Sequence, residues 1–329
     1  MRGNIFSALF SGCLVFGLII TGYTAIAQGP PTSPDKFAEF ISLYPEGKMP
    51  NSKGLMVKDS IANERIYRVG TPGMYAFFPS AQENKGAAVL ICPGGGYERL
   101  AYVVSGTQLA KWFNTIGISA FVLNYRLPNS PDLAQREMGP LQDAQRAMRI
   151  IRANAGRWNI ALNKIGIMGV SAGGHLAASL GNSTGDVTAI SDTLSNVSFL
   201  PDFMILVSPV ITMGPYTHKG SRENLLGNNP SKELIEKYSM ELQVKPTSPP
   251  CFIADAFNDK GVDPRNSLLF YQALLEKNIS TSFHVFPQGG HNIALRNNPG
   301  STQLWTVLCE QWLVEMGFLP PAPPAGGGN

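Results

Sequence analysis

The stretch that decides the fold is Ile165 to Gly173, IGIMGVSAG. Its uninterrupted apolar run, IGIMGV, is typical of a strand buried on both faces of a parallel sheet. The run ends in a G-x-S-x-G pattern centred on Ser171, and the following residues favour a helix. Glycines two residues before and after the serine allow a tight turn from strand to helix, which holds the hydroxyl exposed at the helix N-terminus. Ser171 is therefore a candidate nucleophile; the alternative is an ordinary glycine turn that Ser171 caps.

Five further apolar runs of strand length flank this stretch, and segments of helical period separate them. The runs are Ala87 to Cys92, Ile118 to Leu123, Phe203 to Val207, Cys251 to Ala254 and Phe283 to Phe286. Helices are expected at Thr107 to Ile116, Leu141 to Trp158, Ala172 to Leu180, Pro264 to Lys277 and Ser301 to Met316. This alternation predicts an α/β domain with a doubly wound, mostly parallel sheet and helices on both faces.

The remaining internal segments are expected to lie around this sheet. Glu64 to Val69 and Gly73 to Phe78 resemble the two arms of an antiparallel hairpin at the sheet edge. Residues 182–201 and 209–250 are rich in Gly, Ser, Asn and Pro. We expect them to form long loops or a partial lid above the sheet, with short helical pieces.

The first 27 residues have the pattern of a signal peptide. An apolar stretch from Ile5 to Ile20 follows Arg2, and Ala25-Ile26-Ala27 has small residues where a signal peptidase cleaves. Cleavage is expected near Ala27, which predicts a secreted or periplasmic protein with no membrane anchor in the mature chain. An uncleaved anchor is the alternative, although a membrane span usually needs about 20 apolar residues without such interruptions.

The mature chain is expected to have three parts. An N-terminal extension covers residues 28–54, the α/β domain covers residues 55–318, and a disordered Pro/Gly tail covers residues 319–329. The charges nearly balance at a net +3, and only 15% of the residues are charged. Because no run of basic residues forms a stripe, nucleic acid is not an expected partner. Cys92 and Cys251 lie in apolar runs, where a thiol is usually a small core residue.

A serine nucleophile needs a base, which is usually a histidine held by a carboxylate. Among the four histidines, His291 is the candidate because it follows the last predicted strand in a glycine turn. His284 lies within a strand and His175 within the helix after Ser171, so both are expected to be structural. His218 lies in a loop.

The carboxylate is expected between the serine and the histidine in chain order. Asp259 is the best candidate, because it lies in a turn after the Cys251 strand, beside the predicted His291 loop. Asp263 precedes Pro264 and resembles a helix N-cap. Asp255, at the end of the strand, stays a less favoured alternative.

Three glycines after the Ala87 strand, in Pro93-Gly94-Gly95-Gly96-Tyr97, suggest an oxyanion hole. Attack on an ester places negative charge on the carbonyl oxygen, and backbone amides unobstructed by a Cβ are suitable donors. Gly95, Gly96 and Ala172 are the candidates. No metal site and no cofactor are predicted.

The spacing of PGGGY, NYRLP (Asn124 to Pro128), GVSAGGHLA, NDKGVDPRNS and GGHN resembles the secreted α/β-hydrolase esterases of the acetyl-xylan-esterase-like group. These are related to hormone-sensitive-lipase-type and prolyl-oligopeptidase-type hydrolases. The resemblance covers residues 55 to 315 and implies the α/β-hydrolase fold. It assigns Ser171, Asp259 and His291 to the triad, and Gly95, Gly96 and Ala172 to the oxyanion hole. The chain departs from related lipases at Pro93, where they carry His, and at Asn258, where the acid motif usually has Asp.

The resemblance implies removal of small acyl groups, often acetyl, from plant polysaccharides such as acetylated xylan. Glycoside cleavage is disfavoured, because it needs an acid and a base on opposite sides of the sugar. A prolyl-oligopeptidase-like peptidase, a general short-chain lipase or esterase, and an inactive hydrolase fold serving as a binding module remain alternatives.

Polar residues near the predicted site suit a hydroxyl-rich sugar better than a long acyl chain. The expected substrate-binding residues are Tyr97, Arg126, His218 and Arg222. Of these, Tyr97 and His218 are expected to line the entrance.

Overall fold

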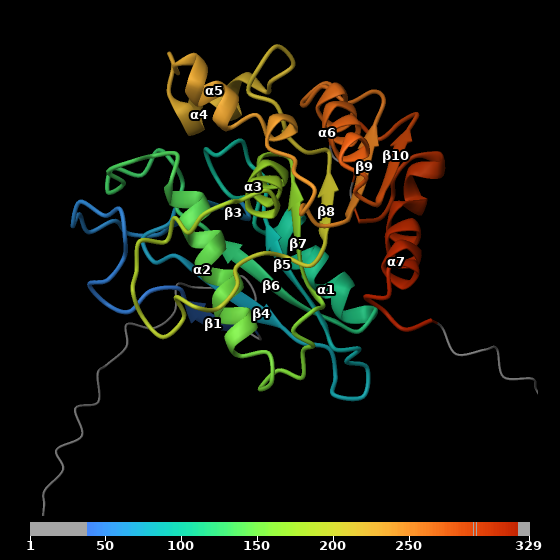
Figure 1. The fold of residues 1–329 in the computed structure, drawn as a ribbon, viewed down its shortest axis with the longest axis horizontal. Coiled ribbons are helices and arrows are strands. Elements are labelled where there is room, and N and C mark those ends of the chain that lie inside the picture. The colour runs from blue at the N-terminus through green and yellow to red at the C-terminus, as the bar shows by residue number, and fades with distance from the viewer. Residues whose placement is uncertain (1–37, 292, 294, 322–329) are drawn as a thin grey trace, which may run out of the picture. The chain divides into compact units, whose positions relative to one another are not determined.

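An eight-stranded sheet forms the centre of the computed structural model, which describes residues 38–291, 293 and 295–321. Six of its strands are parallel and follow the order β6-β5-β7-β8-β9-β10 (Figure 1). They are β5 (Ala87–Cys92), β6 (Ile118–Asn124), β7 (Ile165–Val170), β8 (Met204–Val207), β9 (Cys251–Ala256) and β10 (Thr281–Phe286). β5, β6, β8 and β9 are buried along their whole length. Burial on both faces explains why continuous apolar runs predict these strands.

Two antiparallel strands complete the sheet beside β6. β4 (Gly73–Phe77) pairs with β6, and β1 (Glu39–Ser42) pairs with β4. The predicted hairpin between residues 64–69 and 73–78 is therefore wrong. β3 (Arg65–Arg68) instead pairs with β2 (Ser60–Ala62) in a separate two-stranded sheet. The physical reason is burial: every residue of β4 is buried, so this strand belongs inside the main sheet, whereas both end residues of β3 are exposed.

The boundaries expected at both ends of the α/β domain also differ from the structure. β1 lies within residues 28–54, the expected extension, so the sheet begins before residue 55. At the other end Leu319 is buried, and its N–H donates to the Leu313 carbonyl at 3.0 Å. Ordered packing thus continues into the expected tail. The predicted signal peptide and residues 322–329 lie outside the described residues.

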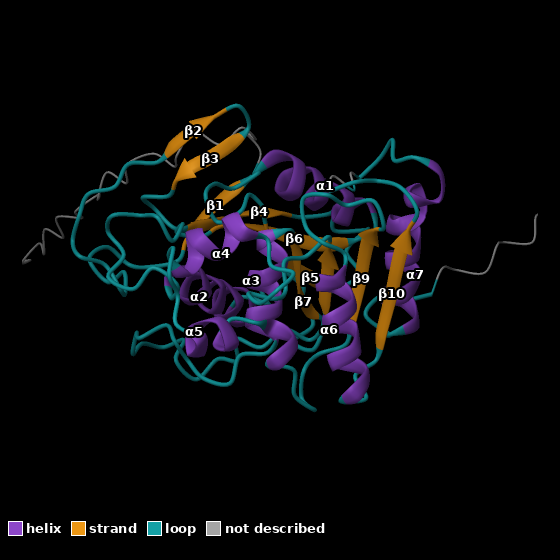
Figure 2. Ribbon diagram, turned by 90° about the horizontal axis from the view of Figure 1, so that it is seen from above, coloured by secondary structure: helices purple, strands orange, loops and turns teal. Residues whose placement is uncertain are grey.

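Helices cover both faces of the sheet (Figure 2). One face carries α1 (Gln108–Thr115) and α7 (Trp305–Glu315), which meet where the Trp112 and Trp305 rings lie 5.6 Å apart. The other face carries α2 (Gly139–Ala153), α3 (Ala172–Gly181) and α6 (Arg265–Glu276). The five predicted helices are present, and α2 ends earlier than predicted because the chain leaves helical geometry at Asn154.

The segment between β8 and β9 lies above the carboxyl ends of the parallel strands (Figure 1). It contains the short helices α4 (Lys219–Leu226) and α5 (Lys232–Lys237), which agrees with the partial lid expected for residues 209–250. Residues 182–201, for which the same was expected, instead run along α2 toward the amino end of β8, and Arg149 donates to the Val197 carbonyl at 2.9 Å. Three further single-turn helices lie at Val103–Thr107, Met240–Leu242 and Gly300–Leu304. Within the described ranges, none of the helices could cross a membrane.

The strand order and the helices on both faces are those of the α/β-hydrolase fold, which confirms the predicted fold class. In such a sheet, the loops at the carboxyl ends of the strands surround the ligand site. The loops after β5, β7, β9 and β10 carry the glycines, the serine, the aspartate and the histidine singled out in the sequence.

Candidate active site

Ser171 occupies a strained turn between β7 and α3. Its φ of 55° and ψ of −124° are unusual for a residue with a side chain. The flanking glycines make this turn possible: a Cβ on Gly169 would lie 2.1 Å from the Gly173 carbonyl oxygen, and one on Gly173 would lie 2.0 Å from the Cys92 carbonyl oxygen. The two glycines of the G-x-S-x-G pattern are therefore required by close backbone contacts, which hold the serine at the edge of the sheet.

His291 connects Ser171 to Asp259. Its Nε2 lies 2.9 Å from the Ser171 Oγ, and its Nδ1 lies 2.8 Å from Oδ2 of Asp259. The other oxygen of Asp259 accepts the N–H groups of Gly261 and Val262 at 2.7 and 2.9 Å. The carboxylate side chain is fully buried, whereas the imidazole is partly exposed. This geometry suits a serine hydroxyl that donates to His291, and an imidazole that donates to a fixed carboxylate.

Two neighbours hold the aspartate and histidine loops together. Asn258 accepts the N–H of Gly290 through Oδ1 at 2.8 Å. A Cβ on Gly261 would lie 2.7 Å from Cγ of His291, so the imidazole packs directly on this glycine. The asparagine that replaces the usual aspartate at position 258 thus has a structural role, because its hydrogen bond to Gly290 holds the turn that precedes His291.

The two alternative acids are occupied elsewhere. Asp255 is buried at the end of β9, where its Oδ2 accepts the Ser267 hydroxyl at 2.6 Å. Burial raises the pKa of Asp255 to about 6. Asp263 accepts the Arg265 N–H at 3.0 Å at the start of α6 and forms an ion pair with the same residue. The structure therefore brings Asp259, and neither alternative, to His291.

The glycine loop after β5 lies against Ser171. A Cβ on Gly94 would be 2.7 Å from the Val170 carbonyl oxygen, and the Gly94 N–H donates to Oγ of Ser105 at 3.1 Å. Gly95 and Gly96 follow with φ values of 132° and 67°. Within the described part of the chain, the N–H groups of these two glycines donate to no protein acceptor. Ala172, the third candidate, is the first residue of α3.

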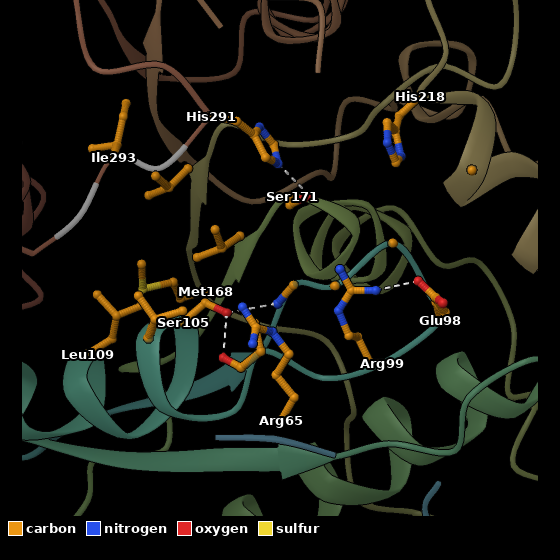
Figure 3. Close-up of a pocket in the computed structure, with 18 of the residues that line it drawn as sticks. Arg65, Glu98, Arg99, Ser105, Leu109, Met168, Ser171, His218, His291 and Ile293 are labelled. Atoms are coloured by element: carbon orange, nitrogen blue, oxygen red, sulfur yellow. Dashed lines mark hydrogen bonds and ion pairs between the residues drawn. The ribbon is translucent and has the colours of Figure 1, made fainter. Parts of the chain in front are cut away.

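A cavity of about 450 Å³ opens above Ser171 and His291. Figure 3 shows Leu109, Met168 and Ile293 on one side of Ser171, and Glu98, Arg99 and His218 on the other. The cavity therefore has an apolar side and a polar side, with the serine hydroxyl between them.

Tyr97 is not an entrance residue. It is 1% exposed, and its hydroxyl lies 2.8 Å from Nδ1 of His175 beneath the glycine loop. The positive φ of Tyr97, 59°, accompanies a side chain that points into the protein rather than toward the cavity. The prediction of a substrate-binding role for Tyr97 is therefore corrected.

Arg126 is also buried and does not line the cavity. Its Nη2 lies 2.7 Å from Oδ1 of Asp143, and its Nη1 donates to the Pro50 carbonyl at 2.6 Å. Tyr44 donates to the same carboxylate at 2.8 Å. The NYRLP motif thus joins β6, α2 and the N-terminal segment, and the predicted contact of Arg126 with substrate is wrong.

His218 caps the N-terminus of α4, Arg222 lies within this helix, and the two side chains have different surroundings. His218 lines the cavity, and its Nδ1 accepts the Ser221 N–H at 3.1 Å, which leaves Nε2 to carry a proton. The pKa of His218 is lowered, mainly by burial and to a smaller extent by the nearby His291. Arg222 donates to the Met213 carbonyl at 3.2 Å and is not among the cavity-lining residues.

Three charged lining residues were not predicted from the sequence: Arg65, Glu98 and Arg99. Asn224 donates to the Gly96 carbonyl at 2.9 Å and so joins α4 to the glycine loop. None of the three charged residues belongs to a motif used in the sequence analysis, and only the folded chain brings them to the cavity. Among the described residues, no group of three or more His, Cys, Asp or Glu could hold a metal ion.

Comparison with known proteins identifies the family to which the chain belongs. Residues 74–274 match the BD-FAE family. An acetylxylan esterase of Xylanibacter ruminicola is 35% identical over 253 residues, covering 75% of this chain and 48% of that protein. Endo-1,4-beta-xylanase B of Butyrivibrio fibrisolvens is 39% identical over 227 residues, covering 69% of this chain and 35% of that protein. The chain thus spans half or less of these two relatives.

A solved structure matches over most of both chains. The acetyl ester-xyloside bifunctional hydrolase from Caldicellulosiruptor lactoaceticus superposes with a TM-score of 0.73 at 33% identity. The alignment covers 85% of this chain and 97% of that chain. The likeness therefore extends over most of both chains.

Proposed function

The chain belongs to the BD-FAE family, and from this premise we propose that it is a serine carboxylesterase removing short acyl groups, chiefly acetyl, from polysaccharides such as acetylated xylan. The observation that carries the proposal is the continuous hydrogen-bonded chain from Ser171 through His291 to Asp259. The names of the Xylanibacter and Caldicellulosiruptor relatives support acetyl esters as substrates.

In the first half of the proposed reaction, Oγ of Ser171 attacks the ester carbonyl carbon while its proton passes to Nε2 of His291. Asp259 keeps the imidazole oriented and stabilises the imidazolium. The carbonyl oxygen becomes negative and accepts N–H groups from Gly95, Gly96 and Ala172. His291 then returns the proton to the departing sugar oxygen, and the acyl group stays on Ser171.

Water completes the second half. His291 takes a proton from a water molecule that attacks the acyl carbonyl, and the same backbone N–H groups stabilise the second oxyanion. Collapse of this intermediate releases acetate and returns the proton to Ser171. The imidazole is partly exposed and lines the cavity, from which the water molecule would approach.

The arrangement of carboxylates favours ester over glycoside cleavage. Glycosidases of the common mechanisms place two carboxyl groups about 5 to 9.5 Å apart across the bond. Among the described residues that line the cavity, Glu98 is the only carboxylate, and it forms an ion pair with Arg99. This observation counts against a xyloside-cleaving role for this cavity.

The sequence of residues 1–27 supports secretion or a periplasmic location after cleavage near Ala27 as part of the same proposal. The experiment that tests the function measures acetate released from acetylated xylan, together with turnover of p-nitrophenyl acetate and octanoate. We expect acetate release and a clear preference for the acetyl ester. Reducing sugar released without acetate would overturn the proposal in favour of glycoside cleavage.

A further inference from the structure

Arg65 is a partly solvent-exposed cation on the wall of the candidate active site (Figure 3). Its neighbour Ile66 is buried and exchanges two backbone hydrogen bonds with Leu100, at 3.0 and 2.8 Å. Leu100 lies four residues after Gly96, so β3 is fastened to the continuation of the glycine loop. The backbone of Arg65 is thus held beside the predicted oxyanion hole rather than on a free surface loop.

The guanidinium of Arg65 has little to bind within the protein. Its hydrogen bond to the Asn63 carbonyl at 3.2 Å uses one of the five N–H donors that an arginine carries. Within the described ranges no carboxylate forms an ion pair with Arg65, not even Glu64, its neighbour in the chain. Arg99, by contrast, is paired with Glu98.

The cavity therefore carries an excess positive charge. Among the described residues that line it, Arg65, Arg99 and Glu98 carry a permanent charge, and the Glu98 charge is matched by Arg99. A guanidinium with free, coplanar N–H groups is the side chain that best matches a carboxylate, which it can bind through two parallel hydrogen bonds. An anionic group on the ligand would neutralise the charge of Arg65 and accept its free N–H groups.

We propose that Arg65 binds a carboxylate on the sugar portion of the substrate, so that the preferred ester is an acetylated polysaccharide bearing uronic acid groups. This inference rests on the proposed esterase function. The acetyl methyl fits the apolar side formed by Leu109, Met168 and Ile293 (Figure 3). The sugar then extends over the rest of the lining, which includes His218 and, below Ser171 in Figure 3, Arg65.

The experiment uses two substrates that differ only in charge. An acidic xylan and the same polymer with its uronic acids reduced to neutral sugars are acetylated to the same degree. The wild type should have a higher kcat/KM on the acidic polymer, and added salt should narrow the difference. Arg65→Met should lower kcat/KM on the acidic polymer about tenfold, mainly through KM, as expected for loss of a charge-assisted hydrogen bond.

The same variant should change turnover of the reduced polymer and of p-nitrophenyl acetate less than twofold. Arg65→Lys should recover part of the preference, since it restores the charge but not the paired geometry. Arg68→Met is the matched control, because Arg68 lies on the same strand, is exposed and does not line the cavity. It should behave as the wild type.

Several outcomes would overturn the inference. Equal loss on both polymers would make Arg65 a general structural or sugar contact. An Arg65→Met effect on p-nitrophenyl hemisuccinate but not on the acidic polymer would place the carboxylate on the acyl side. A wild type that hydrolyses p-nitrophenyl acetate without preferring the acidic polymer refutes this inference alone, whereas absence of all ester hydrolysis refutes the proposed function itself.

Discussion

The Tyr97 hydroxyl lies 2.8 Å from Nδ1 of His175, and Nε2 of the same imidazole lies 2.7 Å from the Tyr238 carbonyl oxygen. A carbonyl can only accept, so Nε2 carries the proton and Nδ1 accepts the tyrosine hydroxyl. The imidazole is fully buried, and burial lowers its pKa to about 4. A neutral His175 therefore joins the glycine loop, α3 and the segment after α5.

Tyr97→Phe tests whether this contact positions the glycine loop. The variant keeps the ring but removes the hydroxyl, which leaves Nδ1 of His175 without its donor. Because Tyr97 directly follows Gly96, we expect the backbone donors to shift and kcat for p-nitrophenyl acetate to fall about tenfold with little change in KM. Steady-state kinetics of the two proteins provide the measurement. A rise in KM at constant kcat would instead restore the entrance role that the sequence suggested.

The buried imidazole also predicts how stability depends on pH. The pKa of His175 is about 4 in the folded protein and about 6.5 when unfolded, so the unfolded chain binds a proton first as the pH falls. The free energy of unfolding should therefore decrease between about pH 6.5 and 4, by up to about 3 kcal/mol from this residue. Urea unfolding at several pH values measures the slope, and His175→Gln should flatten it.

Asp255 should change the pH dependence of the free energy of unfolding in the opposite direction to His175, over an overlapping pH range. Its carboxyl has a pKa of about 6 in the folded protein, above the ordinary value near 3.8, so folding favours the protonated form. Its contribution to stability is present at pH values below 3.8 and is lost as the pH rises through 6. Asp255→Asn should therefore steepen the decrease in stability toward acid pH. An unchanged slope in this variant would argue that Asp255 is ionised in the folded protein.

Substitutions of the hydrogen-bonded chain separate chemistry from structure. Ser171→Ala should fold normally and lose about a thousandfold or more in kcat. Asp259→Asn should lower kcat by a similar factor, because the amide cannot stabilise the imidazolium. Asp263→Asn should instead reduce stability by about 1 kcal/mol or less, since this carboxylate caps α6. Severe loss of activity in Asp263→Asn with normal activity in Asp259→Asn would reassign the acid.

The sequence predicts the parts of this protein that depend on local pattern. The strands β5, β6, β8 and β9 are buried on both faces, so their apolar runs are unambiguous. The G-x-S-x-G turn is dictated by backbone contacts that only glycine permits. The aspartate and histidine follow strands whose order the fold fixes. Local pattern therefore suffices to indicate Ser171, Asp259 and His291 as neighbours.

Residues placed by long-range packing could not be predicted in this way. Arg65 reaches the cavity only because β3 is bonded to Leu100, thirty-four positions after Ile66 in the chain. Tyr97 and Arg126 have polar side chains next to site motifs, and polarity alone suggested contact with substrate. The structure instead gives each a buried partner, His175 and Asp143, which a linear pattern does not reveal.

Arg126 offers the sharpest contrast between a binding role and a structural role. Removing it with Arg126→Met leaves the Asp143 carboxylate buried with the Tyr44 hydroxyl but without its cation. Loss of one partner from a buried ion pair typically lowers stability by about 3 to 5 kcal/mol. We expect a decrease of this size in the free energy of unfolding measured with urea, with kcat/KM for p-nitrophenyl acetate within about twofold of the wild type at temperatures where the variant is folded.

The double variant Arg126→Met with Asp143→Leu should recover much of the lost stability, because no uncompensated charge remains. Normal stability combined with a selective rise in KM for acetylated polymer would contradict the structural role and return Arg126 to the substrate-binding set.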